Sequence, residues 1–192
     1  MEKTMKEYEI AGLLIVAKRQ LVYSEFIARY PASAGKRDFD LVSPTDLFYR
    51  NVCSLSYHDG LLIIGSLVDK DKRVMSFWNW PDFVSIKTEA LQKLTDEFNR
   101  SGLKDIRDQI VAHQDSSNGN NNFPDARRGG VRINLIDKTQ QFLQKLIAEF
   151  YNYKKIKNLI YSPTNFDIGD VYNEVKSVML FAKPTLTDNF II

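Results

Sequence analysis

Apolar residues recur every three or four positions along most of the chain, which is the spacing of one face of an α-helix. In the N-terminal part these residues are Ile10, Leu14, Ala17, Leu21 and Ala28. They predict an amphipathic helix over about residues 5–30, and Pro31 should end it because proline disrupts a helix interior.

A second helix is expected over about residues 44–69. The sequence Ser43-Pro44-Thr45-Asp46 marks its start with a cap serine, a proline at the first helical position and an acid in the first turn. Its second half, Leu61-Leu62-Ile63-Ile64, is apolar on all sides and resembles a strand in composition. Since nothing nearby offers a turn and a pairing strand, we predict a buried helix.

Two further helices follow a connector. The charged run at 69–73 leads to Trp78-Asn79-Trp80-Pro81, where the tryptophans should anchor the connector to the core rather than stack on bases. A third helix is marked by Ile86, Ala90, Leu94 and Phe98 and should close at Gly102, the usual C-terminal residue type. A short fourth helix is expected over 103–114.

The rest of the chain completes an all-α fold. Residues 115–132 are rich in Asn, Gly and Ser and lack periodicity, which predicts one long polar loop. A long fifth helix should cover about 133–161, and a short last helix about 168–182. Because strand-like alternation is nearly absent, we expect a bundle of five or six helices in a single domain over 1–192, with its central part at about 40–160.

Composition narrows the class of protein. A chain of 192 residues with 44% apolar content can bury one sizeable core. Its 26 basic and 24 acidic side chains give a net charge of +2, which excludes a polybasic protein that holds nucleic acid by its overall field. One cysteine, Cys53, cannot form an internal disulfide and favours a reducing compartment, so a cytoplasmic location is expected. No apolar run reaches the ~20 residues of a membrane span.

Several common catalytic and nucleotide-binding signatures are missing from the sequence. It contains no phosphate-binding P-loop, no G-x-G-x-x-G and no G-x-S-x-G elbow. His58 and His113, with Cys53 alone, do not make a zinc site; a carboxylate-only magnesium site stays open but has no dense acidic cluster behind it. We therefore expect no metal and no cofactor, and we interpret Cys53 as a buried structural thiol. The acidic pairs are interpreted as solvated faces or caps: Asp69 with Asp71, Asp105 with Asp108, and Asp167 with Asp170.

The segment 105–115 is the one that carries candidate chemistry. Arg107 and His113 fall on opposite edges of its apolar stripe, and six residues separate them by roughly 9 Å along a helix. Residues at such an edge are partly desolvated, which shifts a histidine pKa. A structural interpretation is also open: His113 suits the negative end of the helix dipole, and Arg107 could pair with neighbouring acids or another helix.

The same segment resembles the signature of the HEPN superfamily, named for higher eukaryotes and prokaryotes nucleotide-binding. In that signature an arginine is followed by a polar residue, and a histidine comes after a stretch of four to six residues that includes the polar one. Here it reads Arg107-Asp108-Gln-Ile-Val-Ala-His113, followed by Gln and Asp115. It is most similar to the branch of bacterial abortive-infection proteins of the U type, and the helical context agrees over about 40–160.

The resemblance implies a metal-independent RNA endonuclease of a phage-defence or toxin type, acting as a homodimer whose two motifs face each other. It implies that His113 is the general acid or base, that Arg107 holds the scissile phosphate and that Asp108 orients them, while the ribose 2′-hydroxyl attacks. The alternative is a catalytically inactive module that binds RNA, a nucleotide or a protein.

The chain departs from the resembled pattern in two places. One subgroup has a tyrosine two residues after the histidine, as the target of a nucleotidyltransferase antitoxin, but this chain has Asp115 there. That route of regulation is not supported, although another protein antitoxin or regulator stays possible. The loop after the motif is also longer than usual in the family and could shape or obstruct the site.

Two basic groups bear on RNA binding. Arg127, Arg128 and Arg132 lie in the polar loop after the motif, where guanidinium groups could reach phosphates. Lysines interleave with tyrosines near the end of the fifth helix, and we interpret them as solvated surface, because cations are favourable near a helix C-terminus. These lysines are Lys154, Lys155 and Lys157.

Overall fold

The computed structural model of the protein describes residues 2–29, 44–115 and 133–157, and that part is built of helices and their connections, with no strand. The elements are α1 (Glu2–Arg29), α2 (Pro44–Leu67), the short 3-10 helix η2 (Phe77–Asn79), α3 (Pro81–Arg100), α4 (Leu103–Asp115) and α5 (Ile133–Ile156). The predicted all-α class and its first five helices are confirmed. The expected polar loop, the expected last helix at 168–182 and the cap at Ser43 lie outside the described residues.

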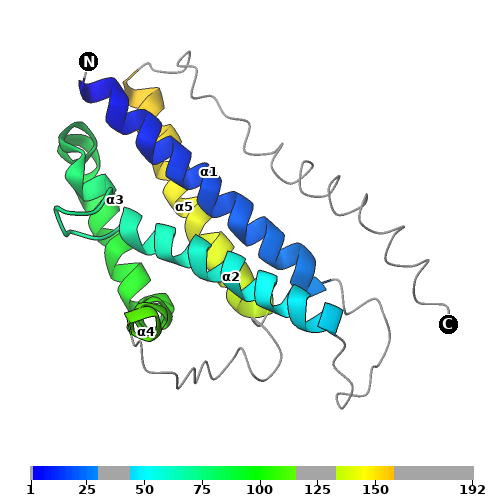
Figure 1. Cartoon of the computed structure of the whole chain (residues 1–192). Coiled ribbons are helices and arrows are strands. Elements are labelled where there is room, and N and C mark those ends of the chain that lie inside the picture. Colours follow the sequence, from blue (N-terminus) through cyan, green and yellow to red (C-terminus); the bar gives the residue numbers. More distant parts are fainter. Residues whose placement is uncertain (1, 30–43, 116–132, 158–192) are drawn as a thin grey trace.

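Three long helices form the body of the bundle (Figure 1). α1 packs most extensively on α2 and also contacts α5, which runs beside it with its C-terminal end near the start of α1. α3 packs on α5, and α4 follows it at the end of the bundle, in contact with both α2 and α3. The motif-bearing helix α4 is therefore held by two different helices.

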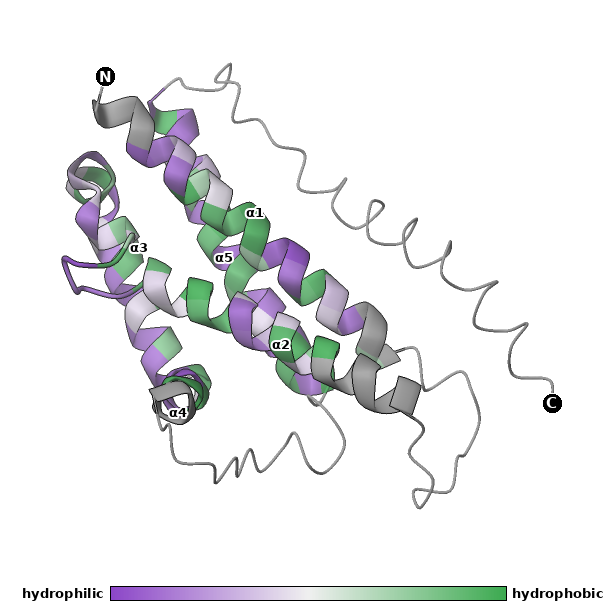
Figure 2. Cartoon of the chain, viewed as in Figure 1, coloured by the Kyte–Doolittle hydropathy of each residue, from purple (hydrophilic) through white to green (hydrophobic). Residues whose placement is uncertain are grey.

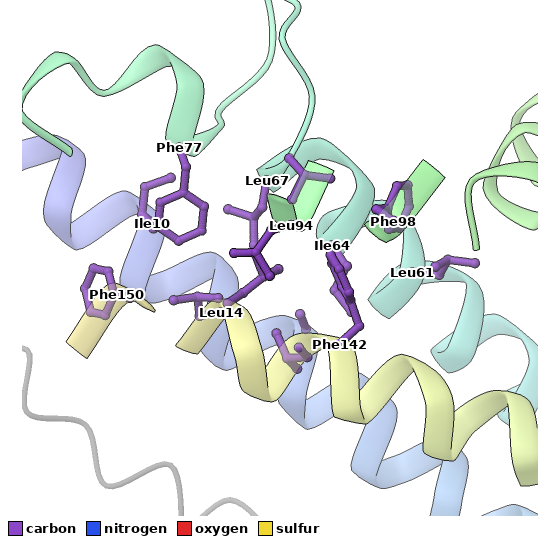
Figure 3. Packing of buried hydrophobic residues seen from close by; sticks show 14 of the residues in the cluster. Ile10, Leu14, Leu61, Ile64, Leu67, Phe77, Leu94, Phe98, Phe142 and Phe150 are labelled. Atoms are coloured by element: carbon purple, nitrogen blue, oxygen red, sulfur yellow. The ribbon is translucent and has the colours of Figure 1, made fainter. Parts of the chain in front are cut away.

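The core is made by the apolar stripes that the sequence pattern predicts. Figure 3 shows side chains from several helices converging on the core, among them Ile10 of α1, Ile64 of α2 and Phe142 of α5. The apolar run in α2 is helical, as predicted; Leu61 and Ile64 are both 0% exposed, whereas Leu62 and Ile63 are partly buried. Each large side chain buried in this way contributes about 1.5–3 kcal/mol relative to exposure. Figure 2 shows hydrophobic and hydrophilic residues mixed along each helix, as expected for helices with one buried face.

An aromatic cluster fastens the connector between α2 and α3 to the bundle. Trp80 is 3% exposed, and its ring lies 5.5 Å from that of Phe83 and 4.7 Å from that of Tyr153. The Trp78 indole N–H donates to Thr95 Oγ1 at 3.0 Å. The tryptophans anchor the connector, as predicted. α3 begins at Pro81, ahead of its first periodic residue, because proline is favourable at the first position of a helix.

Polar contacts also join the helices inside the bundle. The Ser24 hydroxyl of α1 donates to the Cys53 carbonyl of α2 at 3.1 Å, and Cys53 is 3% exposed, which confirms the buried thiol. The Tyr57 hydroxyl lies 3.2 Å from Thr139 Oγ1 of α5, and burial raises the pKa of Tyr57 to about 12 despite this hydrogen bond. These pairs fix the register of α2 against both neighbours.

The interpretation of the α5 lysines as solvated surface is wrong for Lys154. Its side chain is 2% exposed, and its Nζ lies 3.5 Å from Glu7 Oε1 of α1, whose side chain is 6% exposed. Lys155 and Lys157 are exposed, as predicted. The helix also ends at Ile156, five residues before the expected position 161. A buried charge needs a charged or hydrogen-bonding partner. Glu7 of α1, far from Lys154 in the sequence, provides that partner.

Candidate functional site

The candidate site is built on α4, which begins immediately after a sharp turn. Gly102 adopts φ +81°, a left-handed conformation that favours glycine, and the chain changes direction here between α3 and α4 (Figure 1). Leu103 and Ile110 are then buried at 1% and 3% exposure, as the predicted apolar stripe requires. Burial of that stripe fixes the rotation of α4 and places Arg107 at the boundary between core and surface.

The aliphatic part of Arg107 crosses α2 at a glycine. A Cβ atom placed on Gly65 would lie less than 3.0 Å from the Arg107 Cδ, so no other residue type fits there without a shift. On the α3 side, the Arg107 Cζ lies 5.9 Å from the centroid of the Phe98 ring, within the range of a cation–π interaction. The side chain is 20% exposed and is held between two helices.

The Arg107 guanidinium contacts two carboxylates. Its Nη1 donates to Asp69 Oδ2 at 3.3 Å, and its Nε and Nη2 donate to Asp108 Oδ1 at 2.9 and 2.7 Å. Lys104 donates to the other Asp108 oxygen, Oδ2, at 2.6 Å. We call Asp69, Lys104, Arg107 and Asp108 the Arg107 cluster; its two cations and two anions balance.

Asp108 is ionised more readily than an ordinary aspartate. Partial burial alone would raise its pKa, but the hydrogen bonds from Lys104 and Arg107, together with their positive charges, outweigh burial and lower the pKa. The carboxylate therefore stays charged at neutral pH and keeps its bonds to Arg107. Asp108 thus holds the guanidinium through the bonds from Nε and Nη2.

The structure brings together two of the three predicted catalytic residues, Arg107 and Asp108. The third, His113, belongs to α4, since the helix extends to Asp115, but its side chain lies outside the described residues. Arg127, Arg128 and Arg132, predicted to contact RNA, also lie outside them. The roles of these four residues stay predictions.

Sequence reasoning missed the contribution of α2 to this site. Asp69 was grouped with Asp71 as a solvated or capping acid, and it does accept the Asp71 backbone N–H at 3.0 Å, but it also binds Arg107. Gly65 carried no prediction. Nothing in a single sequence links these positions to a residue about 40 positions later, because the link arises from helix packing.

Other candidate sites in the described part of the chain are less developed. A pocket of about 720 Å³ lies between α3 and α5, but several of its charged side chains already form ion pairs: Lys87 Nζ lies 2.9 Å from Glu149 Oε2, and Lys145 Nζ lies 2.6 Å from Oε1 of Glu97, outside the lining. No group of three or more His, Cys, Asp or Glu residues that could hold a metal ion occurs within 2–29, 44–115 and 133–157. The Arg107 cluster is therefore the strongest candidate.

No protein-family model, curated protein or solved structure matches the chain. Among the described helices, none has the length and apolar character needed to cross a membrane.

Proposed function

We propose that this protein is a metal-independent RNA endonuclease of a phage-defence or toxin type that acts as a homodimer. In this proposal Arg107 holds the scissile phosphate, His113 transfers protons, and Asp108 orients Arg107. The ribose 2′-hydroxyl loses its proton and attacks the adjacent phosphorus, and the bond to the 5′-oxygen of the next nucleotide breaks as that oxygen gains a proton. The products are a 2′,3′-cyclic phosphate and a 5′-hydroxyl end.

The proposal depends on one observation: the Arg107 guanidinium is held by its neighbours but keeps N–H donors that they do not use. A guanidinium has five N–H donors, and the contacts with Asp69 and Asp108 use three of them, so two stay available among the described residues. The group is also fixed by its packing on Gly65 and Phe98 while still reaching solvent. A rigid arginine with two N–H donors left suits bidentate binding of a phosphate.

An exposed apolar residue supports the homodimer. Val111 follows Arg107 by four residues, so both lie on one face of α4, and Val111 is 41% exposed. A symmetric contact across this face would cover Val111 and bring two copies of the motif together. His113 follows Arg107 by six positions, so the two residues are roughly 9 Å apart along one helix. A second copy of the motif across the dimer interface could bring an arginine and a histidine to the same phosphate, which one helix alone does not do.

The test is RNA cleavage in excess EDTA by the full-length protein. We expect fragments ending in a 2′,3′-cyclic phosphate from the wild type and none from His113→Ala or Arg107→Ala. Arg73→Ala is the matched control, because Arg73 is 88% exposed and pairs with Asp71 outside the Arg107 cluster. Its cleavage rate should equal that of the wild type.

Three results would contradict the proposal. Identical RNA products from the wild type and His113→Ala would assign the cleavage to a contaminant or to another site. Cleavage abolished by EDTA and restored by Mg²⁺ would exclude the metal-independent mechanism. RNA bound at the Arg107 cluster without cleavage would favour the alternative, an inactive binding module.

A further inference from the structure

Asp69 lies directly after α2, in a turn that fixes its carboxylate. Its backbone N–H donates to the Ser66 carbonyl at 3.1 Å, and its Oδ1 accepts the backbone N–H of Asp71 at 3.0 Å. The second oxygen, Oδ2, accepts from Arg107 Nη1. Each carboxylate oxygen therefore has its own partner, so the turn sets the direction in which the charge faces Arg107.

The two acids that bind Arg107 differ in whether they can fix its guanidinium relative to the rest of the bundle. Asp108 is the next residue on the same helix and moves with it, so it cannot set the guanidinium relative to the rest of the bundle. Asp69 lies in the turn after α2, and within the described part of the chain it supplies the hydrogen bond that ties the guanidinium to an element other than α4. Gly65, one turn earlier on α2, lets the arginine reach that carboxylate.

We propose that Asp69 is a positioning residue for Arg107: its carboxylate, held by the turn after α2, sets the orientation in which the remaining N–H donors of Arg107 meet the scissile phosphate. This inference rests on the proposed function. Asp69 does not itself contact the substrate. It acts by removing the rotational freedom of a long side chain, which is how preorganised groups contribute to catalysis.

The test compares Asp69→Asn with Asp71→Asn in the full-length protein. Both variants remove one negative charge from the same turn, but Asp71 pairs with the exposed Arg73 and not with Arg107. We expect Asp69→Asn to lower kcat about tenfold to hundredfold, as small misplacements of catalytic groups do. KM should change little, because RNA affinity comes from many phosphate contacts. Asp71→Asn should keep the wild-type kcat.

A merely structural role of Asp69 gives different results. In that case the loss of activity would follow the unfolded fraction and would vanish when the assay is run well below the Tm of both variants. Asp69→Glu restores a carboxylate and should recover part of kcat if positioning is correct. Equal kcat values for Asp69→Asn and the wild type, or equal losses in Asp69→Asn and Asp71→Asn, would overturn the inference.

A second measurement separates this inference from the proposed function. The Arg107 Nη1 resonance in ¹⁵N NMR spectra reports, without any cleavage, the order of the guanidinium at the nitrogen that donates to Asp69, and Arg107→Lys assigns it. Asp69→Asn should broaden this resonance and speed its exchange with water, whereas Asp71→Asn should not. Lack of RNA cleavage by the wild type would overturn the proposed function alone, and an unchanged resonance in Asp69→Asn would overturn the positioning by Asp69.

Discussion

Arg107 lies across the backbone of Gly65, and the two residues leave no space for a side chain at position 65. A Cβ atom there would come within 3.0 Å of Arg107 Cδ, a separation that carbon atoms do not adopt without a shift of one partner. The approach of α4 to α2 at this point is what brings the guanidinium to Asp69. A glycine in one helix therefore decides where a charged group of another helix can be placed.

Gly65→Ala should displace Arg107 and lower RNA cleavage at least tenfold. Overpacking typically costs about 1–3 kcal/mol, while alanine gains about 1 kcal/mol over glycine within a helix, so the net loss of stability is about 0–2 kcal/mol. Activity should thus fall more clearly than the Tm. Cleavage rates and thermal unfolding of the same preparation measure both effects.

Gly12→Ala is the control for that substitution. Gly12 lies within α1, and a Cβ atom there would have no neighbour within 4 Å. We expect this variant to be stabilised by up to about 1 kcal/mol and to cleave RNA at the wild-type rate. Full activity in Gly65→Ala would show that Arg107 tolerates the added methyl group or does not take part in cleavage.

Val111→Glu should dissociate the proposed homodimer and abolish cleavage. A charge placed at an apolar contact must be desolvated and would face its own copy across a symmetric interface. Sedimentation velocity over a range of concentrations gives the oligomeric state. The folded monomer should keep its Tm, since Val111 is 41% exposed within one chain.

Val16→Glu is the matched control for Val111→Glu, because Val16 is 40% exposed but lies on α1. It should leave the dimer and its activity unchanged. A wild-type protein that sediments as a monomer at all concentrations would rule out the homodimer. Equal dissociation by both substitutions would place the contact elsewhere.

The helices could be predicted from the sequence because their signals are local. The spacing of Ile10, Leu14 and Leu21 reports the buried face of α1 directly, and Gly102 marks the turn before α4. Errors arose at helix ends and at Lys154, where distant residues decide the outcome. An amphipathic lysine near a helix C-terminus is usually solvated, and only the packing of α1 against α5 shows that this one is buried.

The candidate site could be predicted only in part, for the same reason. Arg107 and Asp108 are neighbours in the sequence, and their pairing was one of the open interpretations. The contacts with Gly65, Asp69 and Phe98 depend on how α4 crosses α2 and α3, which no spacing within α4 encodes. A motif names the candidate residues, but the helices around it decide how they are held.

His58 should make the protein less stable in mild acid. Burial lowers the pKa of His58 below its ordinary value of 6.5, and this outweighs the opposite effect of the Asp59 charge. The unfolded chain therefore binds more protons than the folded chain below pH 6.5, so the free energy of unfolding falls as the pH drops below that value. Urea unfolding between about pH 5 and 7 measures this change.

His58→Gln should flatten that dependence, and the difference between the two curves isolates His58. Aspartates with lowered pKa values, Asp71 and Asp108, lose their contribution to stability only near and below their ordinary pKa of 3.8, outside this range. Equal pH dependence in the wild type and His58→Gln would show that His58 is protonated as easily in the folded chain as in the unfolded chain.

Lys154→Met should destabilise the protein by about 3–5 kcal/mol, the range measured when one partner of a buried ion pair is removed. The substitution takes away the cation that lies 3.5 Å from Glu7 Oε1 and leaves that carboxylate at 6% exposure. The Tm and the urea midpoint should both fall. Lys155→Met is the control, because Lys155 is the exposed neighbour on the same helix and its loss should change stability by less than about 0.5 kcal/mol.

The double variant Glu7→Met/Lys154→Met decides whether the pair itself stabilises the contact between α1 and α5. Replacing both partners of a buried pair by apolar residues of similar size is often neutral or stabilising, because neither charge then has to be desolvated. We therefore expect the double variant to regain most of the stability lost in Lys154→Met. A double variant as unstable as Lys154→Met would mean that the loss comes from packing of the lysine stem against the core, and not from the buried charge of Glu7.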